Sequence, residues 1–403
     1  MTGPLRSLRV VEYGQGIAAP FAGKLFADLG ADVIKIEPPG GDWLRRRAPF
    51  ADDGPGLERS GPFFYLNTGK RSVVLNLESE TGRAIFERLL PEVDILIEDT
   101  PDGWLAERGL APDAMRRQFP RLVLVSVTPF GRTGPHRGYR GGDFIGAAAS
   151  GLAYLARPRA FADVRSELPP IRPAGNQVGF VTGLAAALGA LIALFGRAKS
   201  GEGDTVDVSM QEAALAGLGP SFAQWSYQGH IVGRAALPDS APICLMRCRD
   251  GWVWLQCSEE HHWRAFVEMM GSPDWAALDI FQDRFTRGAN WDALEPLLLE
   301  WTLQHDKEEI FREAQARRIP HAPAYTFEEV LRNTHLLARG AFPAVAHPLL
   351  GDVRIPRSPL VFSATPPETR RPPLLGEHTG DLLVHLGFDR GAIAALAADG
   401  IVA

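Results

Sequence analysis

Residues 169–214 read PPIRPAGNQVGFVTGLAAALGALIALFGRAKSGEGDTVDVSMQEAA, and this stretch decides the fold. After the prolines, the thirteen residues Gly183–Phe195 carry no charge and no strongly polar side chain. Thirteen residues are too few to span a bilayer and fit a buried core helix instead. Its many Gly and Ala residues would let other backbone pack close against it. Basic residues then stand where a helix C-terminus favours cations, Gly201 ends the helix, and residues 205–210 alternate as a strand. The stretch therefore predicts an α/β core element.

The N-terminal part of the chain has the pattern of further units of this kind. A β-run at Leu8–Tyr13 leads into Gly14-x-Gly16-x-x-Ala19, followed by an expected helix at 20–29 and a strand at Val33–Glu37. On spacing alone this is also a dinucleotide fingerprint, with Glu37 as the ribose ligand. An amphipathic helix at 79–90 and buried strands at 93–98 and 122–127 continue the alternation. We predict an α/β fold with a doubly wound, largely parallel, Rossmann-like sheet in a large domain.

The character of the sequence changes after Leu237. ICLMRCRDGWVWLQCS is typical of a two-stranded hairpin across an Asp-Gly turn. Helices are expected at 259–270, with Ser258 as N-cap, at 291–301 and at 307–318. The sequence thus predicts a smaller α+β domain at 235–325, between a first part of the large domain at 1–225 and a Pro-rich return segment with its C-terminal part at 326–403.

Composition excludes several classes of protein. The net charge of −6 gives no indication of nucleic-acid binding. The N-terminus lacks the apolar core of a signal peptide and no transmembrane run is expected, so we expect a cytoplasmic protein without a membrane partner. Three cysteines, an odd number with spacing unlike a zinc site, are expected to be buried thiols. The run Glu259–His262 suggests a metal site, but none is expected there, because adjacent residues on a helix point about 100° apart.

Four blocks of the sequence carry a resemblance that covers nearly the whole chain. RAKSGEGDTVDVSMQEAAL at 197–215 resembles the R-x-x-(S/T)-G-x-G-x-x-V-D-V-S-M-x-E-A signature of the family III CoA-transferases, the CaiB/BaiF group. The blocks at 8–42, 61–77 and 372–388 resemble the opening, second and closing blocks of that family. The resemblance implies an interlocked dimer and an enzyme without a covalently bound cofactor, which uses a coenzyme A thioester and a carboxylic acid as substrates. It also favours CoA over NAD at the glycine-containing loop.

One departure from the family pattern concerns the nucleophile. Active relatives have a G-D-x-x-(T/S/A)-G run before the buried helix, and the Asp attacks an acyl-CoA thioester to give a mixed anhydride and a CoA thiolate. Counting back four residues from Gly183 reaches Gly179, which has no side chain for this step. Racemases of the family also need a His where Gly142 stands, so a racemase function is not expected.

The remaining site residues are implied by the resemblance alone. The family's acid corresponds to Asp143, a weak candidate for the missing nucleophile. An Asn and an aromatic residue that contact CoA in relatives are replaced by Asp99 and Thr100, and an acid there would repel the diphosphate unless it is paired. The loop after the first strand presents backbone amides at a helix N-terminus, which suit an anionic ligand. The positions expected at the CoA site are Gln15, Gly16, Ala18, Arg45, Leu75, Asp99, Thr100, Arg140 and Asp143.

Three interpretations follow. The first is a CoA-transferase subunit that lacks the catalytic Asp and pairs with an intact homologue in a heterodimer or heterotetramer, as the benzylsuccinate CoA-transferases of this family suggest. Its acids would be aromatic or dicarboxylic, for example succinyl-CoA as donor and a benzylsuccinate-like acceptor. The second is a non-catalytic, CoA-binding or structural homodimer. The third is other CoA-thioester chemistry that uses Asp143 or a substrate carboxylate.

Overall fold

The computed structural model describes residues 3–51, 54–156, 170–231 and 241–403. The chain divides into two compact units. The first comprises Met1–Ala153, Arg172–Phe222 and Gly340–Ala403, and the second comprises Tyr154–Ile171 and Ala223–Arg339. The domain limits expected from the sequence stay a prediction.

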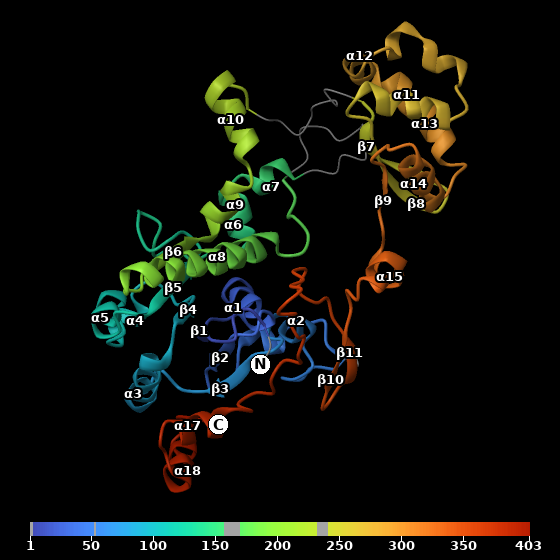
Figure 1. Cartoon of the computed structure of the whole chain (residues 1–403). Helices are drawn as coiled ribbons and strands as arrows, with labels where there is room; N and C mark the ends of the chain where they lie inside the picture. The colour runs from blue at the N-terminus through green and yellow to red at the C-terminus, as the bar shows by residue number, and fades with distance from the viewer. Residues whose placement is uncertain (1–2, 52–53, 157–169, 232–240) are drawn as a thin grey trace. The chain divides into compact units, whose positions relative to one another are not determined.

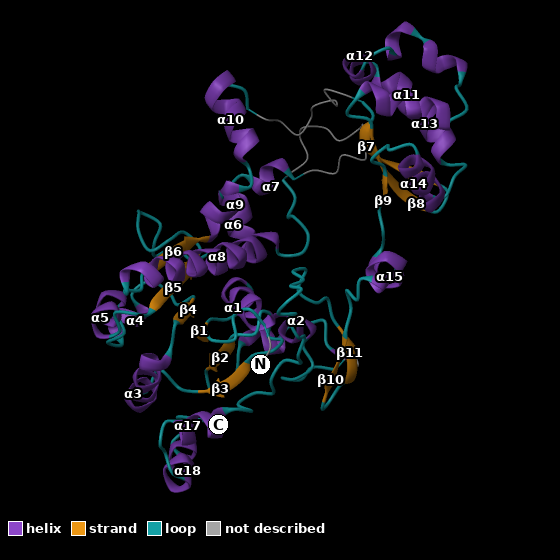
Figure 2. Ribbon diagram, in the orientation of Figure 1, coloured by secondary structure: helices purple, strands orange, loops and turns teal. Residues whose placement is uncertain are grey.

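A six-stranded parallel sheet forms the centre of the first unit (Figures 1 and 2). Its order is β3-β2-β1-β4-β5-β6, and every neighbouring pair is parallel. This order confirms the predicted doubly wound fold, whose ligand crevice lies at the carboxyl ends of the strands, where the order reverses between β1 and β4. The strands are β1 (Arg9–Tyr13), β2 (Asp32–Glu37), β3 (Arg71–Val74), β4 (Ile95–Glu98), β5 (Val123–Thr128) and β6 (Thr205–Ser209).

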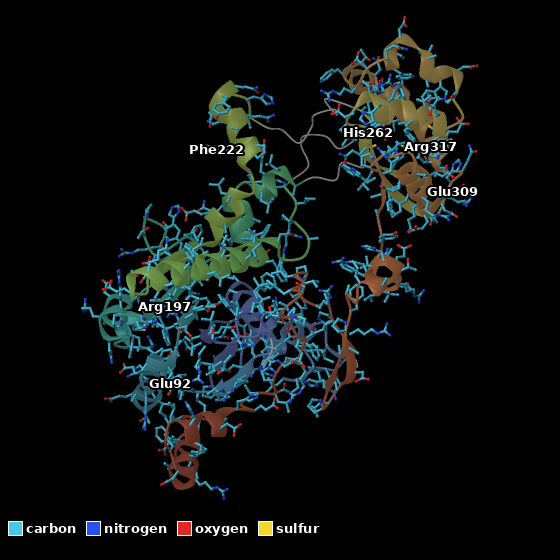
Figure 3. The ribbon with its side chains drawn as sticks, in the orientation of Figure 1. Glu92, Arg197, Phe222, His262, Glu309 and Arg317 are labelled. Atoms are coloured by element: carbon cyan, nitrogen blue, oxygen red, sulfur yellow. The ribbon has the colours of Figure 1, made fainter. Side chains whose placement is uncertain are left out.

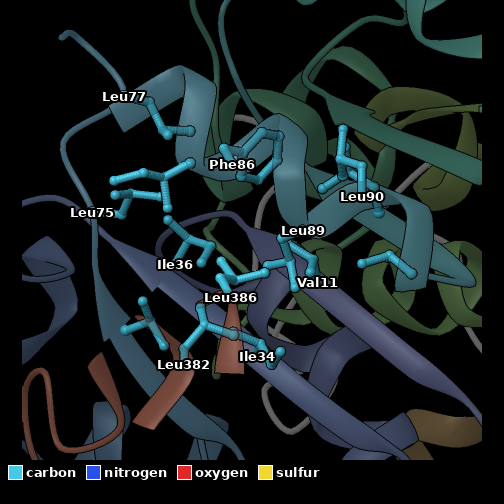
Figure 4. Packing of buried hydrophobic residues seen from close by; sticks show 14 of the residues in the cluster. Val11, Ile34, Ile36, Leu75, Leu77, Phe86, Leu89, Leu90, Leu382 and Leu386 are labelled. Carbon is cyan, nitrogen blue, oxygen red and sulfur yellow. The ribbon is translucent and has the colours of Figure 1, made fainter. Parts of the chain in front are cut away.

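Helices cover both faces of this sheet, which is why its central strands are apolar throughout. On one face, α3 (Glu80–Leu89) packs with α17 (Thr379–His385) and the segment after it. Figure 4 shows Leu382 and Leu386 from the end of the chain beside Ile34 and Ile36 of β2. The C-terminal segment therefore completes a core begun at the N-terminus. The other face is covered by α1 (Ala18–Asp28) and α8 (Gln177–Ser200).

Helix α8 contains the predicted core helix but is 24 residues long, because it extends beyond the apolar run at both ends. A Cβ on Gly183 would lie 2.5 Å from the carbonyl oxygen of Ala18, so the predicted close approach of another backbone is confirmed. Gly201 ends the helix with φ of +80°, a conformation that favours glycine. The apolar run of thirteen residues, too short by itself to span a bilayer, is therefore only part of the helix. Its length and composition would suffice to cross a membrane, a test that core helices of soluble proteins also pass.

The remaining elements of the first unit are short. After β2, Asp42 accepts the Leu44 N–H at 2.8 Å and caps a 3₁₀ helix, η1 (Trp43–Arg46). Strands β10 (Ala344–His347) and β11 (Gly351–Arg354) form a separate antiparallel pair. The others are α2 (Gly61–Leu66), η3 (Leu90–Glu92), α4 (Trp104–Glu107), α5 (Pro112–Gln118), α6 (Asp143–Ala149), α9 (Met210–Ala216) and α18 (Arg390–Ala398). Two further helices include residues assigned to the second unit: α7 (Leu152–Leu155) and α10 (Gly219–Gln228).

The second unit contains the predicted hairpin, β7 (Ile243–Cys248) and β8 (Gly251–Gln256), which β9 (Ala322–Pro323) extends to three antiparallel strands. The three cysteines are buried free thiols in its core. Glu259, not Ser258, is the N-cap of α11 (Glu260–Met269), and its side chain makes no capping bond. The other elements are η4 (Asp274–Ala277), η5 (Asp279–Phe281), α12 (Arg284–Ala289), α13 (Trp291–Thr302), α14 (Lys307–Ala316), α15 (Phe327–Arg332) and α16 (Thr334–Ala338).

Candidate active site

A cavity of about 430 Å³ opens at the carboxyl ends of the parallel strands. It lies where strand order reverses, the usual place for a ligand in this type of sheet, and its volume is in the range of small-molecule sites. None of the described residues that line it is Lys or Arg. The lining consists of Tyr13, Gly14, Gln15, Ile36, Pro38, Trp43, Asn76, Leu77, Glu78, Asp99, Thr100, Pro101 and Trp104.

The aromatic residues Tyr13, Trp104 and Trp43 contribute apolar surface to the cavity. The rings of Tyr13 and Trp104 lie 5.3 Å apart, and burial raises the pKa of Tyr13 to about 12, so its hydroxyl stays neutral. The Trp43 side chain is 46% exposed. Its backbone N–H donates to Gln15 Oε1 at 3.1 Å, which ties η1 to the loop after β1. The cavity can therefore accept a flat or apolar portion of a ligand.

A buried ion-pair network below the cavity holds these loops in place. Lys35 Nζ donates to the Gly14 carbonyl and to Glu12, both at 2.7 Å, and pairs with Asp42 at 2.9 Å. Burial alone would lower the pKa of Lys35, but the Asp42 and Glu12 carboxylates raise it above its usual value. Asp42 also lies 3.4 Å from the Gly16 N–H. Lys35 is thus a positioning residue for the loop 14–16, a role that the sequence did not indicate.

Arg45 and Glu37 belong to the same buried layer. The Arg45 guanidinium donates to Glu37 through Nε and Nη2 at 2.8 Å, and to Glu58 through Nη1 at 2.8 Å. Burial would raise the pKa of Glu37, but hydrogen bonds and charge from Arg45 lower it to about 2. Glu37 also accepts hydrogen bonds from the Ser72 hydroxyl and the Asp42 N–H, so each of its oxygens accepts two bonds and the dinucleotide interpretation loses its ribose ligand. The contact of Arg45 with CoA stays a prediction, and in this structure its donors face protein groups.

Asp99 and Thr100 both line the cavity, as expected for ligand contacts. Asp99 Oδ2 accepts the Gln15 N–H at 2.9 Å. Burial, with smaller contributions from the charges of Glu98 and Asp42, raises the pKa of Asp99 to about 8 against the opposing hydrogen bond and the charge of Lys35. The carboxyl group is therefore mainly neutral at pH 7. The repulsion expected between Asp99 and an anionic ligand is correspondingly weaker.

Gly179, the position expected for the family's nucleophile, packs against a neighbouring side chain. Gly179 is buried in the first turn of α8, and a Cβ there would lie 2.8 Å from Ile17 Cγ2 and 3.1 Å from Ile17 Cβ. Real Cβ atoms do not approach other carbons so closely. The Gly179 N–H donates to Asp143 Oδ1 at 2.9 Å, and Arg172 lies 3.9 Å from Asp143 Oδ2. Asp143 thus acts as the cap of α8, whose own N-cap residue, Asn176, makes no side-chain capping bond to the helix.

The other expected site residues are distributed more widely. Gln15 lines the cavity, and Gly16 lies beside Trp43. Leu75 is buried in the core, while its neighbours Asn76 and Leu77 line the cavity instead. Ala18 begins α1 and packs in the core. Arg140 is exposed and does not line the cavity.

Comparison with known proteins identifies the family of this chain. The sequence model of CoA-transferase family III matches residues 5–379. The chain belongs to this family. It is 32% identical to a succinyl-CoA–D-citramalate CoA-transferase of Chloroflexus aurantiacus over 99% of this chain and 98% of that protein. It is 33% identical to subunit BbsE of a succinyl-CoA:(R)-benzylsuccinate CoA-transferase of Thauera aromatica, over 94% and 93% of the two chains.

The fold agrees with a solved member of the group. A crystal structure of a CaiB/BaiF family protein from Brucella suis superposes with a TM-score of 0.85, at 27% identity over 96% of this chain and 100% of that one. CoA-transferases, the class of enzyme to which this family belongs, use CoA thioesters as substrates. No group of three or more metal-ligating side chains occurs among the residues that the structure describes.

Proposed function

We propose that this chain is a subunit of a family III CoA-transferase that moves CoA between carboxylic acids and that it operates with an intact homologue. The observation that carries the proposal is the contact between residues 17 and 179. Gly179 lacks the nucleophile, and Ile17 occupies the space where the side chain of an Asp would begin.

The surroundings of Gly179 oppose a carboxylate at this position. An Asp there would have to displace the branched side chain of Ile17, which is the N-cap residue of α1. It would also bring a second carboxylate close to Asp143, whose Oδ1 would be 3.7 Å from the new Cβ. Two like charges at such a distance disfavour each other's ionisation. The environment is therefore adapted to glycine.

The chemistry of the family explains why a partner is required. A carboxylate of the enzyme must attack the thioester carbonyl, forming a mixed anhydride and releasing the CoA thiolate. Gly179 can form no such bond. In the proposed assembly the homologue supplies that carboxylate, while this chain supplies a complementary fold and a CoA-binding cavity.

Exposed apolar surface supports association with another chain. On α8, Leu184, Leu188, Ile192 and Phe195 lie three or four residues apart and are each more than half exposed. Residues at this spacing share one face of a helix, and a continuous apolar face of this kind marks an interaction surface. Helix α10 has no buried residue, and its Phe222 is 62% exposed (Figure 3). We infer an interlocked heterodimer or heterotetramer, consistent with a relative that is named as a subunit.

The substrates are proposed from the relatives and the cavity. Both relatives described above are named for succinyl-CoA as a substrate, so we propose succinyl-CoA as donor and an aromatic or dicarboxylic acid, such as a benzylsuccinate, as acceptor. The aromatic cavity without Lys or Arg suits the neutral portions of CoA, and the exposed Arg140 is available to its phosphates. Buried free thiols fit a reducing cytoplasm, the location that we propose.

A second candidate function rests on Asp143. Its carboxylate is the acidic group nearest to the position of the missing side chain, at 3.7 Å from a Cβ on residue 179. The hydrogen bond from the Gly179 N–H favours a capping role, because it holds Asp143 Oδ1 toward the helix and not toward a substrate.

Co-expression tests the pairing. A tagged copy of this chain, expressed with a family homologue encoded beside it that retains the Asp, should co-purify with that homologue in equal amounts by native mass spectrometry. Changing the Asp of the partner to Ala should abolish CoA transfer while leaving the assembly intact. A homodimer of this chain alone, in the presence of such a homologue, would contradict the proposal.

A further inference from the structure

A second cavity in the first unit is basic and lies at the opposite end of strand β3. It has a volume of about 480 Å³ and is lined by residues that flank the start of β3, by strand β10 and by the segment 369–378. Arg71 begins β3, whereas Asn76, five residues later, lines the candidate active site. At about 3.3 Å per residue, the two ends of this segment are roughly 16 Å apart. The basic cavity is therefore a separate place on the molecule.

The charges around this cavity are of one sign. Its ionisable lining residues are Lys70, Arg71, Arg370, Arg371 and His378, and no Asp or Glu is among the described residues that line it. Two of these cations are already engaged: Lys70 Nζ is bonded to Glu12 at 2.6 Å, and Arg371 Nη1 to Glu377 at 2.8 Å. The cavity as a whole keeps a surplus of positive charge.

Arg71 and Arg370 retain donors that these pairs do not use. The nearest carboxylate to Arg71 is a single oxygen of Asp32 at 3.6 Å, which Arg9 also contacts at 3.1 Å. Arg370 is half-buried, and within the described residues it has no ion pair or hydrogen bond. A guanidinium offers five N–H donors in a planar fork that matches carboxylate and phosphate oxygens. Both side chains are thus available to an oxyanion.

His378 adds a neutral donor to the same lining. Its Nδ1 accepts the Ser72 N–H at 3.3 Å, and its backbone N–H donates to the Ser72 carbonyl at 2.9 Å. The ring is therefore fixed relative to β3. Because Nδ1 is an acceptor, a neutral ring carries its proton on Nε2, where it is a donor.

From this arrangement we infer an oxyanion-binding site in the cavity, formed chiefly by Arg71, Arg370 and His378. The ligand is a small dianion, either a phosphate group or a dicarboxylate, because two forked donors face a cavity without carboxylates. An oxyanion binds more strongly to a bidentate Arg than to a neutral donor, and its binding to Arg weakens as the salt concentration increases. This inference does not depend on the proposed pairing or on catalysis.

Calorimetry in a phosphate-free buffer tests the site, with CoA at saturation so that the active site is occupied. Inorganic phosphate and succinate are titrated separately. We expect saturable binding of one of them, at one site per copy of this chain. Arg370→Gln should weaken it at least 10-fold and Arg370→Lys less, while the affinity for CoA stays unchanged. Arg116→Gln, which removes an exposed charge outside the cavity, is the matched control and should have no effect.

The outcomes separate the two sources of oxyanion and can overturn the inference. Binding of phosphate but not succinate assigns the site to a phosphate group, and the reverse assigns it to a dicarboxylate. Absence of saturable binding for both would refute the site. Equal weakening by Arg370→Gln and Arg116→Gln, or binding that Arg370→Gln leaves intact, would also refute it. Because CoA affinity is measured in the same samples, failure here is distinct from failure of the proposed function.

Discussion

Ile17 Cγ2 lies 2.8 Å from the point where a Cβ on Gly179 would stand, so the N-terminus of α1 fills the space beside the first turn of α8. The two residues are far apart in sequence, yet each determines what the other can be. Residue 179 is the position where the resemblance predicts the family's nucleophile, and this contact places an apolar side chain there.

Gly179→Asp should destabilise the chain by about 1–3 kcal/mol, the usual cost of inserting atoms into a packed site. Ile17→Ala should make room, so the double variant should lose less than the sum of the two single variants. A double-mutant cycle measured by urea unfolding gives the coupling, which we expect to be favourable by about 1 kcal/mol or more. Additive effects would show that the two side chains do not compete for space.

Asp143→Ala should remove the cap of α8 and lower the free energy of unfolding by about 1 kcal/mol. Asp143→Asn keeps an oxygen that can accept the Gly179 N–H, so it should cost less. Neither change should reduce CoA transfer by the assembled pair beyond the loss of folded protein. If Asp143→Asn abolished transfer with stability unchanged, Asp143 would be a catalytic residue.

Asp99 should make both stability and ligand binding depend on pH. Its folded-state pKa of about 8 exceeds the unfolded value near 4, so the folded chain keeps a proton that the unfolded chain has lost. Stability relative to Asp99→Asn should therefore fall as pH rises from 4 to 8 and then level off. Because solvent in the open cavity screens the charge of Asp99, we expect the free energy of unfolding relative to Asp99→Asn to fall by about 2 kcal/mol between pH 4 and pH 8.

Titration of Asp99 should also change the affinity of the chain for CoA. Above pH 8 a charged Asp99 should weaken CoA binding, and Asp99→Asn should make the affinity independent of pH in this range. Parallel pH profiles for the wild-type chain and Asp99→Asn, in unfolding and in calorimetry, would rule out this role.

Lys35→Met should be the most damaging of the changes considered. It leaves the carboxylates of Glu12 and Asp42 buried without this partner, and breaking a buried pair costs about 3–5 kcal/mol. The matched control is Lys199→Met, because Lys199 is exposed and lies over the Phe195 ring. This substitution should lower the free energy of unfolding by less than about 0.5 kcal/mol. Thermal unfolding distinguishes the two, and similar losses would contradict the importance of the buried network.

Much of the fold could be predicted from local patterns. The run Val33–Glu37 is apolar and β-branched enough to identify β2, and Gly201 correctly marked the end of α8. The start of α8 was less predictable, because its cap is supplied by Asp143, distant in sequence, and not by the residue before the helix. The prediction that Ser258 is the N-cap of α11 was wrong, because Glu259 takes that position.

The candidate site was predictable only in part, for the same reason. Gln15, Asp99 and Thr100 follow strands β1 and β4, and the loops after such strands meet at the crevice. Ile17 could not be identified, because no short-range pattern reports which side chain fills the space left by a glycine. Arg45 was expected at the CoA site, and its buried pairing with Glu37 could not be predicted, because it depends on tertiary packing.

The exchange of labelled succinate into succinyl-CoA tests the central claim most directly, since it reports CoA transfer without knowledge of the physiological acceptor. The purified chain alone should show no exchange above background, because Gly179 provides no nucleophile. The assembly with an intact homologue should exchange, and loss of the partner's Asp should stop it. Exchange by the lone chain at the rate of the assembly would contradict the account.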